Sequence, residues 1–171
     1  MKRKYIYKPY NPCFPELFQK EKLRLLGILN PKTVTIEHIG STAVPGLGGK
    51  GIIDIGVVVA KDDIESTFRC IESLGYTFRE TGSSPERLFF RVDLPDFEED
   101  TRRYHLHLTF SGSLEWKRLI AFRDYLRSDP LALQAYADLK KKSAQEANED
   151  GVLYREKKAP FFKSALEKLF K

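Results

Sequence analysis

The stretch HIGSTAVPGLGGKGIIDIGVVVA, residues 38–60, decides the fold because it joins a glycine-rich turn to a strongly apolar segment. Residues 51–59 are rich in β-branched side chains and apolar on both faces, which predicts a central strand of a sheet. Side chains alternate along a strand, so Asp54 and Gly56 share one face. A buried carboxylate is costly unless it is paired or bound to metal. Asp54 is therefore a candidate site residue, the alternative being a structural aspartate satisfied by backbone N–H groups or an arginine.

The glycines before this strand do not form a common nucleotide motif. Residues 46–51, GLGGKG, match the dinucleotide-binding fingerprint in letters, but a strand follows them where that fingerprint needs a helix. A Walker phosphate loop is excluded because Val44 replaces its first glycine and Gly51 replaces the Ser or Thr that binds magnesium. The loop by itself is most simply a flexible connection.

The step Gly40-Ser41-Thr42 is more informative, because it ends a predicted strand and opens a short helical turn. Glycine allows the backbone to approach a phosphate closely, and the Ser41 hydroxyl with the N–H groups of Ser41 and Thr42 would donate to it. Ser and Thr are also ordinary N-caps. The turn therefore indicates a phosphate-binding site only together with other residues.

The rest of the sequence predicts a mixed α/β order. The acidic, proline-containing segment 93–103 is expected to be a loop. We predict one α/β (α+β) domain over residues 1–171, with a mixed sheet, flanking helices and a helical C-terminal third. Helices are expected over residues 15–30, 62–76, 114–128, 130–147 and 157–171, and strands over 33–39, 51–59, 87–92 and 104–110.

The amino-acid composition limits the classes of function that we expect for this protein. Apolar residues make up 42% of the chain and charged residues 31%, which is ordinary for a globular protein. No segment approaches transmembrane length and no apolar signal core follows the first basic residues, so we expect a cytoplasmic protein without a membrane partner. Cys13 and Cys70 are isolated, which argues against a disulfide framework or a zinc ribbon. The net charge of +5 is spread over helices without a basic-aromatic motif, so nucleic acid is not an expected partner.

The segment YHLHLTF, residues 104–110, adds a second group of candidates. Strand alternation places His105, His107 and Thr109 on one face. Two histidines on one strand face suit metal ligation or phosphate donation, although a single histidine is more often structural.

Several cationic side chains are candidates for binding an anion. Arg87 and Arg91 share one face of the strand before the histidines, and Arg123 shares a helix face with Arg127. Lys50 lies between the Gly-Ser turn and Asp54 and would neutralise phosphate charge. For each of them the alternative is a solvated surface charge.

Four blocks resemble the GrpB-like family of the nucleotidyltransferase-fold superfamily, whose domains also occur fused to dephospho-CoA kinase. They are IEHIGSTAVPGLGGKGIIDI (36–55), YHLHL (104–108), FRDYLRSDP (122–130) and YADLK (136–140). The blocks span nearly the whole chain in the right order, and the first is specific. The resemblance implies a Gly-Ser turn that holds a triphosphate, matched by Gly40 and Ser41, and two carboxylates on the next strand that bind two magnesium ions.

The sequence departs from this pattern at the second carboxylate. Asp54 matches the first, but Gly56 stands at the second position. If the site uses one ion held by Asp54 and a histidine, Gly56 would leave room there for a substrate group. A third carboxylate usually comes from a later strand, where His107 or His105 is nearest. Asp54 and His107 are thus the candidate catalytic residues. Asp54, His105 and His107 are the candidate ligands of a divalent metal ion (Mg, Mn or Zn), and this set suits one manganese or zinc ion better than a magnesium pair.

Two function classes stay open. The first is metal-dependent transfer of a nucleotidyl or phosphoryl group from a nucleotide or another phosphorylated small molecule. The second is a catalytically inactive nucleotide- or anion-binding module that keeps the fold. The missing carboxylate favours the second class, whereas Asp54, the histidines and the Gly-Ser turn favour the first.

Overall fold

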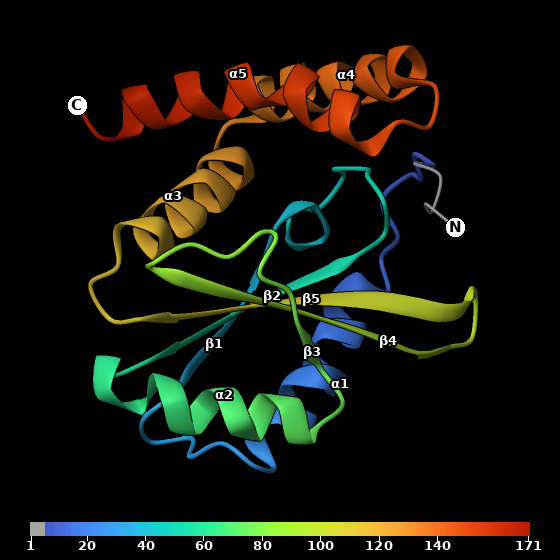
Figure 1. Ribbon diagram of the computed structural model, residues 1–171. Helices are drawn as coiled ribbons and strands as arrows, with labels where there is room; N and C mark the ends of the chain where they lie inside the picture. Colours follow the sequence, from blue (N-terminus) through green and yellow to red (C-terminus); the bar gives the residue numbers. More distant parts are fainter. Residues whose placement is uncertain (1–5) are drawn as a thin grey trace.

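A five-stranded mixed sheet forms the centre of the computed structural model, which describes residues 6–171 (Figure 1). The strand order is β1-β2-β5-β4-β3. Strands β2 and β5 are parallel, and the other neighbouring pairs are antiparallel. The strands are β1 (Thr35–Ile39), β2 (Ile53–Val59), β3 (Thr77–Phe78), β4 (Arg87–Asp96) and β5 (Asp100–Phe110).

Helices cover both faces of the sheet. The first two lie on one face, and the last three lie on the other side together with the glycine-rich loop (Figure 1). Helix α4 ends at Asn148 in a left-handed conformation, and α5 begins directly afterwards, with the Asp150 side chain capping its first N–H groups. The helices are α1 (Phe14–Leu26), α2 (Ile64–Ser73), α3 (Leu114–Ser128), α4 (Pro130–Ala147) and α5 (Gly151–Leu169), with short 3-10 turns η1 (Ser41–Ala43) and η2 (Lys61–Asp63).

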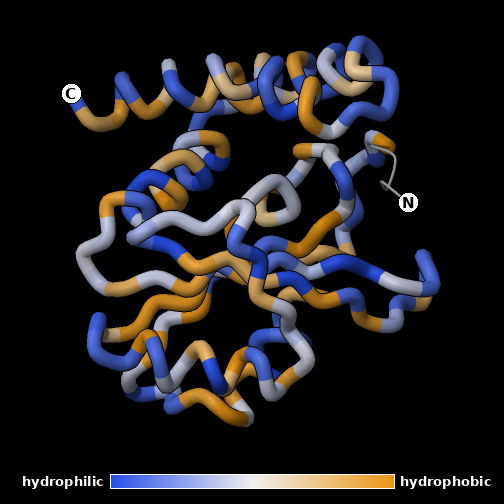
Figure 2. The backbone as a smooth tube through the Cα atoms, in the orientation of Figure 1, coloured by the Kyte–Doolittle hydropathy of each residue, from blue (hydrophilic) through white to orange (hydrophobic). Residues whose placement is uncertain are grey.

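The main core lies between the sheet and helices α1 and α2. On β2 the residues Ile53, Ile55 and Val57 are fully buried there, and Leu106 and Leu108 of β5 join them. Figure 2 shows hydrophobic segments along the strands, whereas α4 and α5 alternate hydrophilic and hydrophobic residues. Because strand side chains alternate, the residues between these positions, Asp54 among them, face the C-terminal helices.

The sequence-based prediction of a mixed α/β sheet with β2 inside it is confirmed, since β2 pairs on both sides. The prediction of a loop over residues 93–103 is wrong, because β4 and β5 continue through it as a long hairpin. The first and last helices also differ from expectation: α1 ends at Leu26, and α5 begins at Gly151 rather than at residue 157. The short strand β3 was not expected. Within residues 6–171 no helix combines the length and apolarity needed to cross a membrane.

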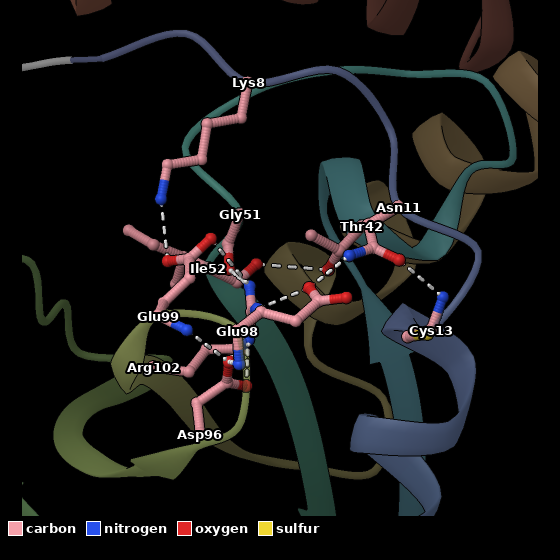
Figure 3. A network of polar contacts seen from close by, with 10 residues as sticks. All are labelled: Lys8, Asn11, Cys13, Thr42, Gly51, Ile52, Asp96, Glu98, Glu99 and Arg102. Carbon is pink, nitrogen blue, oxygen red and sulfur yellow. Dashed lines mark hydrogen bonds and ion pairs between the residues drawn. The ribbon is translucent and has the colours of Figure 1, made fainter.

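The hairpin persists because a buried arginine neutralises its acidic tip (Figure 3). Arg102 is 1% exposed, and its Nε lies 2.7 Å from Asp96 Oδ2. Its Nη1 donates to the carbonyl oxygen of Gly51 at 3.0 Å. Glu99 pairs at 2.7 Å with Lys8, whose backbone exchanges two hydrogen bonds with Gly49. The hairpin tip and the N-terminal segment together hold the glycine-rich loop in place.

We expect Arg102→Met to lower the free energy of unfolding by about 3 kcal/mol, because it leaves Asp96 buried without its partner. The matched control is Arg103→Met, which removes a more exposed pair with Asp93 and should cost less than about 1 kcal/mol. Urea unfolding followed by circular dichroism measures both. Equal losses in the two variants would contradict a structural role specific to Arg102.

Candidate functional site

The register of the parallel strands brings the three predicted metal ligands together. Asp54 of β2 is level with His105 of β5, and Gly56 is level with His107. His105 Nδ1 lies 3.3 Å from Asp54 Oδ1, and His107 Nε2 lies 3.6 Å from the same oxygen. The Asp54 side chain is 24% exposed. The expected convergence on the sheet face opposite the main core is therefore present.

Asp54 is ionised in this setting. Burial by itself raises the pKa of its carboxyl, but His105 and His107 beside it reverse the effect and hold the pKa below its ordinary value. Burial lowers the pKa of His107, and Asp54 only partly offsets this. At neutral pH the Asp54 carboxylate therefore lies next to a neutral His107 imidazole. The Nδ1 atom of His107 is buried and has no hydrogen-bond partner among residues 6–171.

The Gly-Ser turn lies directly against this carboxylate. Gly40 has φ 71°, and a Cβ at this position would overlap the Asp54 carboxylate. The next residue, Ser41, opens the 3-10 turn. A glycine is needed here for the backbone conformation and for the close approach to Asp54, whereas the sequence analysis expected it to allow a close approach to a phosphate.

Lys140 of α4 is the principal residue that the sequence analysis did not single out. It is 1% exposed, and its Nζ donates to Ser41 Oγ. Burial, with repulsion from Lys158, lowers its pKa to about 7, while Asp54 acts in the opposite direction. A lysine buried against a neutral hydroxyl is an uncommon arrangement, because the desolvated charge has no full counter-charge.

Helix α5 adds two more cationic side chains to the site, Arg155 and Lys158. Burial lowers the pKa of Lys158, with Asp54 opposing the shift and Lys50 and Arg155 reinforcing it. These residues, together with Lys140 and Asp54, line a cavity of about 490 Å³, which we call the cationic chamber. It is lined by Ser41, Thr42, Lys50, Gly51, Ile52, Asp54, Thr81, Gly82, Arg87, Phe89, His105, His107, Lys140, Tyr154, Arg155 and Lys158.

A second cavity of about 520 Å³ adjoins the first, which we call the apolar chamber. Both cavities share Ser41, Asp54, Arg87, His107, Arg155 and Lys158, so these residues lie at the boundary between them. The apolar wall comes mainly from α3, α4, α5 and the turn after η1. It consists of Ile39, Val44, Leu47, Leu119, Phe122, Leu126, Tyr136, Ala159 and Phe162.

The predicted anion-binding residues divide into two groups. Gly40, Ser41, Thr42, Lys50 and Arg87 line one or both chambers. Arg87 also pairs with a glutamate of α3, its Nε lying 3.1 Å from Glu115 Oε2.

Arg91 and Arg123 are placed differently. Arg91 is level with His105 on the neighbouring strand, but it is not among the described residues that line either chamber. Arg123 borders the apolar chamber, and its guanidinium is held at 2.8 Å by both Glu37 and Asp124. It therefore fastens α3 to β1, which leaves it less capacity for a ligand.

The Thr42 side chain has a structural partner on each side. Its hydroxyl donates to the carbonyl oxygen of Ile52 at 3.1 Å, so its oxygen accepts from His38 Nε2 at 2.9 Å. His38 stacks on Phe18 with ring centroids 4.6 Å apart, and burial lowers its pKa to about 4. Only the backbone N–H of Thr42 is therefore available to the predicted phosphate site, whereas the hydroxyl of Ser41 faces the cavity.

The residues do not fit a pair of magnesium ions. The second carboxylate position, Gly56, is covered by the Trp116 ring of α3, which a Cβ at Gly56 would overlap. The expectation that Gly56 leaves room for a substrate group is wrong for the same reason. Among residues 6–171 no three His, Cys, Asp or Glu side chains are arranged as a metal site. The expected ligand set of Asp54, His105 and His107 thus has no support as a preformed site.

Sequence reasoning missed Lys140, Lys158, Arg155 and Trp116. Lysines and arginines on helices are usually solvated, so their residue type gave no signal. Lys140 does fall in one of the four blocks that carry the family resemblance, YADLK, and Trp116 is the single tryptophan of the chain. These were the two features of the sequence that could have pointed to the missed residues.

Comparisons with known proteins show which chains this one resembles. UPF0157 protein BH1888 of Halalkalibacterium halodurans is 38% identical over 80% of this chain and 67% of its own length. UPF0157 protein YqkA of Bacillus subtilis is 33% identical over 97% of this chain, which spans 47% of YqkA. A dephospho-CoA kinase of Mycolicibacterium paratuberculosis matches at 25% identity over 92% of this chain and 44% of its own length.

Solved structures also include a protein named GrpB. The crystal structure of conserved protein GrpB from Enterococcus faecalis has a TM-score of 0.78 at 30% identity, covering 97% of this chain and all of that one. The MgGTP-bound Cid1 poly(U) polymerase has a TM-score of 0.50 at 14% identity, covering 78% of this chain and 45% of that one, and shows the fold alone. A family model described as GrpB protein matches residues 6–168. The chain belongs to the GrpB family, with a nucleotidyltransferase-like fold.

Proposed function

We propose that the two chambers bind a phosphorylated small molecule, such as a nucleotide. The anionic group would occupy the cationic chamber, and the rest of the molecule would extend into the apolar chamber. The observation that carries the proposal is the buried Lys140, whose hydrogen-bond partner is the neutral hydroxyl of Ser41. A bound phosphate would supply the counter-charge that this lysine lacks, and it would relieve the repulsion with Lys158.

Transfer of a nucleotidyl or phosphoryl group is the second candidate. It is favoured by the ionised Asp54, which borders the same cavity as the Gly-Ser turn. Incubation of the protein with ATP, with and without magnesium or manganese, followed by chromatography of the products, separates the candidates. Release of pyrophosphate or ADP supports transfer, whereas saturable binding without product supports a binding module.

Replacement of Lys140 tests the proposal most directly. Lys140→Met keeps the length of the side chain and removes its charge, so calorimetric affinity for tripolyphosphate should fall by about tenfold or more, as expected for a charge-assisted hydrogen bond. The thermal midpoint of the free protein should rise, because a buried charge without a full counter-charge is destabilising. Lys141→Met, on an exposed neighbour, should change neither quantity. Unchanged affinity in Lys140→Met would contradict the proposal.

The affinity should also depend on pH. Because the pKa of Lys140 is lowered to about 7 from 10.5, the ammonium form predominates below pH 7 and is lost above it. Binding of sulfate, whose charge is constant in this range, should therefore weaken by up to about tenfold per unit above pH 7. The groups nearest to Lys140 are Ser41, Tyr136, Lys158 and Asp54, and Asp54 stays ionised throughout.

Unfolding does not explain such a loss. Between pH 7 and 10.5 the unfolded chain holds the Lys140 proton more firmly than the folded one, so this residue makes the protein more stable as the pH rises. Calorimetric titration of sulfate from pH 6 to 9 measures the effect, and Lys140→Met should show a flatter profile. An equal slope in both proteins would assign the pH dependence to another group.

A further inference from the structure

We propose that this pocket binds its phosphorylated ligand without a divalent metal ion, with Lys140 and Lys158 supplying the positive charge. The inference rests on the proposed function and specifies its chemistry: the ligand is the free phosphate anion and not its magnesium complex. Three observations support it, concerning the position of the missing carboxylate, the contacts of Asp54 and the balance of charge.

The first observation is steric. Two-metal phosphoryl transfer requires oxygen ligands that bridge ions about 3.5–4 Å apart. Gly56 is the position from which a second strand carboxylate would reach the ions, and the Trp116 ring covers it so closely that a Cβ would overlap the ring. An aromatic side chain thus fills the space that the missing carboxylate would occupy. If a metal ligand had only been lost, this space would not need to be filled.

The second observation concerns Asp54, the remaining carboxylate. Its Oδ1 is approached by both His105 and His107, at 3.3 Å and 3.6 Å. Its other oxygen, Oδ2, lies against the Gly40 backbone. Both imidazoles lie against the same carboxylate oxygen, so a cation bound there would have to displace one of them.

The third observation is the balance of charge. Asp54 is the single carboxylate among the described residues that line the cationic chamber, whereas the cations there are Lys50, Arg87, Lys140, Arg155 and Lys158. Burial lowers the pKa of both Lys140 and Lys158, and neighbouring cations add to it: Lys158 acts on Lys140, and Lys50 and Arg155 act on Lys158. A divalent cation would add to this repulsion, because hard cations are held by several oxygen ligands and by negative charge. A polyanion would be stabilised by the same field.

The two kinds of site predict opposite effects of magnesium. Where metal ions bridge protein and phosphate, magnesium strengthens binding. If the lysines of the cationic chamber bind the phosphate, magnesium in solution competes with them for the phosphate oxygens. The magnesium–phosphate complex also carries less negative charge than the free anion. Magnesium should therefore weaken binding at constant ionic strength.

The test is calorimetric titration of the full chain with tripolyphosphate, first in EDTA and then with 5 mM magnesium or manganese at matched ionic strength. We expect saturable binding in EDTA and an affinity at least about threefold weaker with magnesium, as the free anion is depleted. Binding that appears only with metal, or strengthens with it, would overturn the inference and leave the proposed function intact. Lack of binding under both conditions would overturn the proposed function, and the inference with it.

Substitutions in the protein test the inference independently of the magnesium titration. Lys158→Met should weaken binding in EDTA by about tenfold. The half-buried Lys157 pairs with Glu146 and lines neither chamber, so Lys157→Met should have little effect on binding. The double variant Gly56→Asp/Trp116→Ala restores both a second carboxylate and the space for it, and it should gain manganese binding in electron paramagnetic resonance titrations. Trp116→Ala alone is the control and should bind no manganese. Manganese binding by the wild-type protein at Asp54, abolished in Asp54→Asn, would refute the metal-free assignment.

Discussion

The ionised carboxylate of Asp54 on a central strand is the constraint on which the rest of the site depends. A carboxylate that is partly withdrawn from water needs partners, and the neighbouring strand supplies them. Strand β5 contributes two imidazoles, and the turn after β1 brings the Gly40 backbone against Oδ2. The lysines of α4 and α5 then provide longer-range attraction, which partly offsets the lowering of their own pKa values by burial.

Much of this arrangement follows from local sequence. The alternation of apolar and polar residues on β2 and β5 placed Asp54, His105 and His107 on one face, because a period of two holds for any strand. The hairpin could not be foreseen in the same way. Residues 93–103 have the composition of a loop, and only the burial of Arg102 among acidic side chains turns them into paired strands.

The cationic half of the site was less predictable for a different reason. Helical periodicity shows that a segment has a buried side, but α4 and α5 bury few large apolar residues, so the sequence does not indicate which turn faces the sheet. Lys140 and Lys158 therefore look like surface residues. Likewise, Gly56 shows that a ligand is missing, while the Trp116 ring that occupies its place comes from a helix about sixty residues further along the chain.

The bond between Lys140 and Ser41 joins residues 99 positions apart, and this separation has a consequence for how the protein is made. Translation proceeds from the N-terminus, so β2 and the Gly-Ser turn leave the ribosome long before α4 and α5. During that interval Asp54 has only nearby imidazoles and solvent around it. The nascent chain can assemble its sheet, but the cationic chamber is complete only when α5 has been released and has packed against α4.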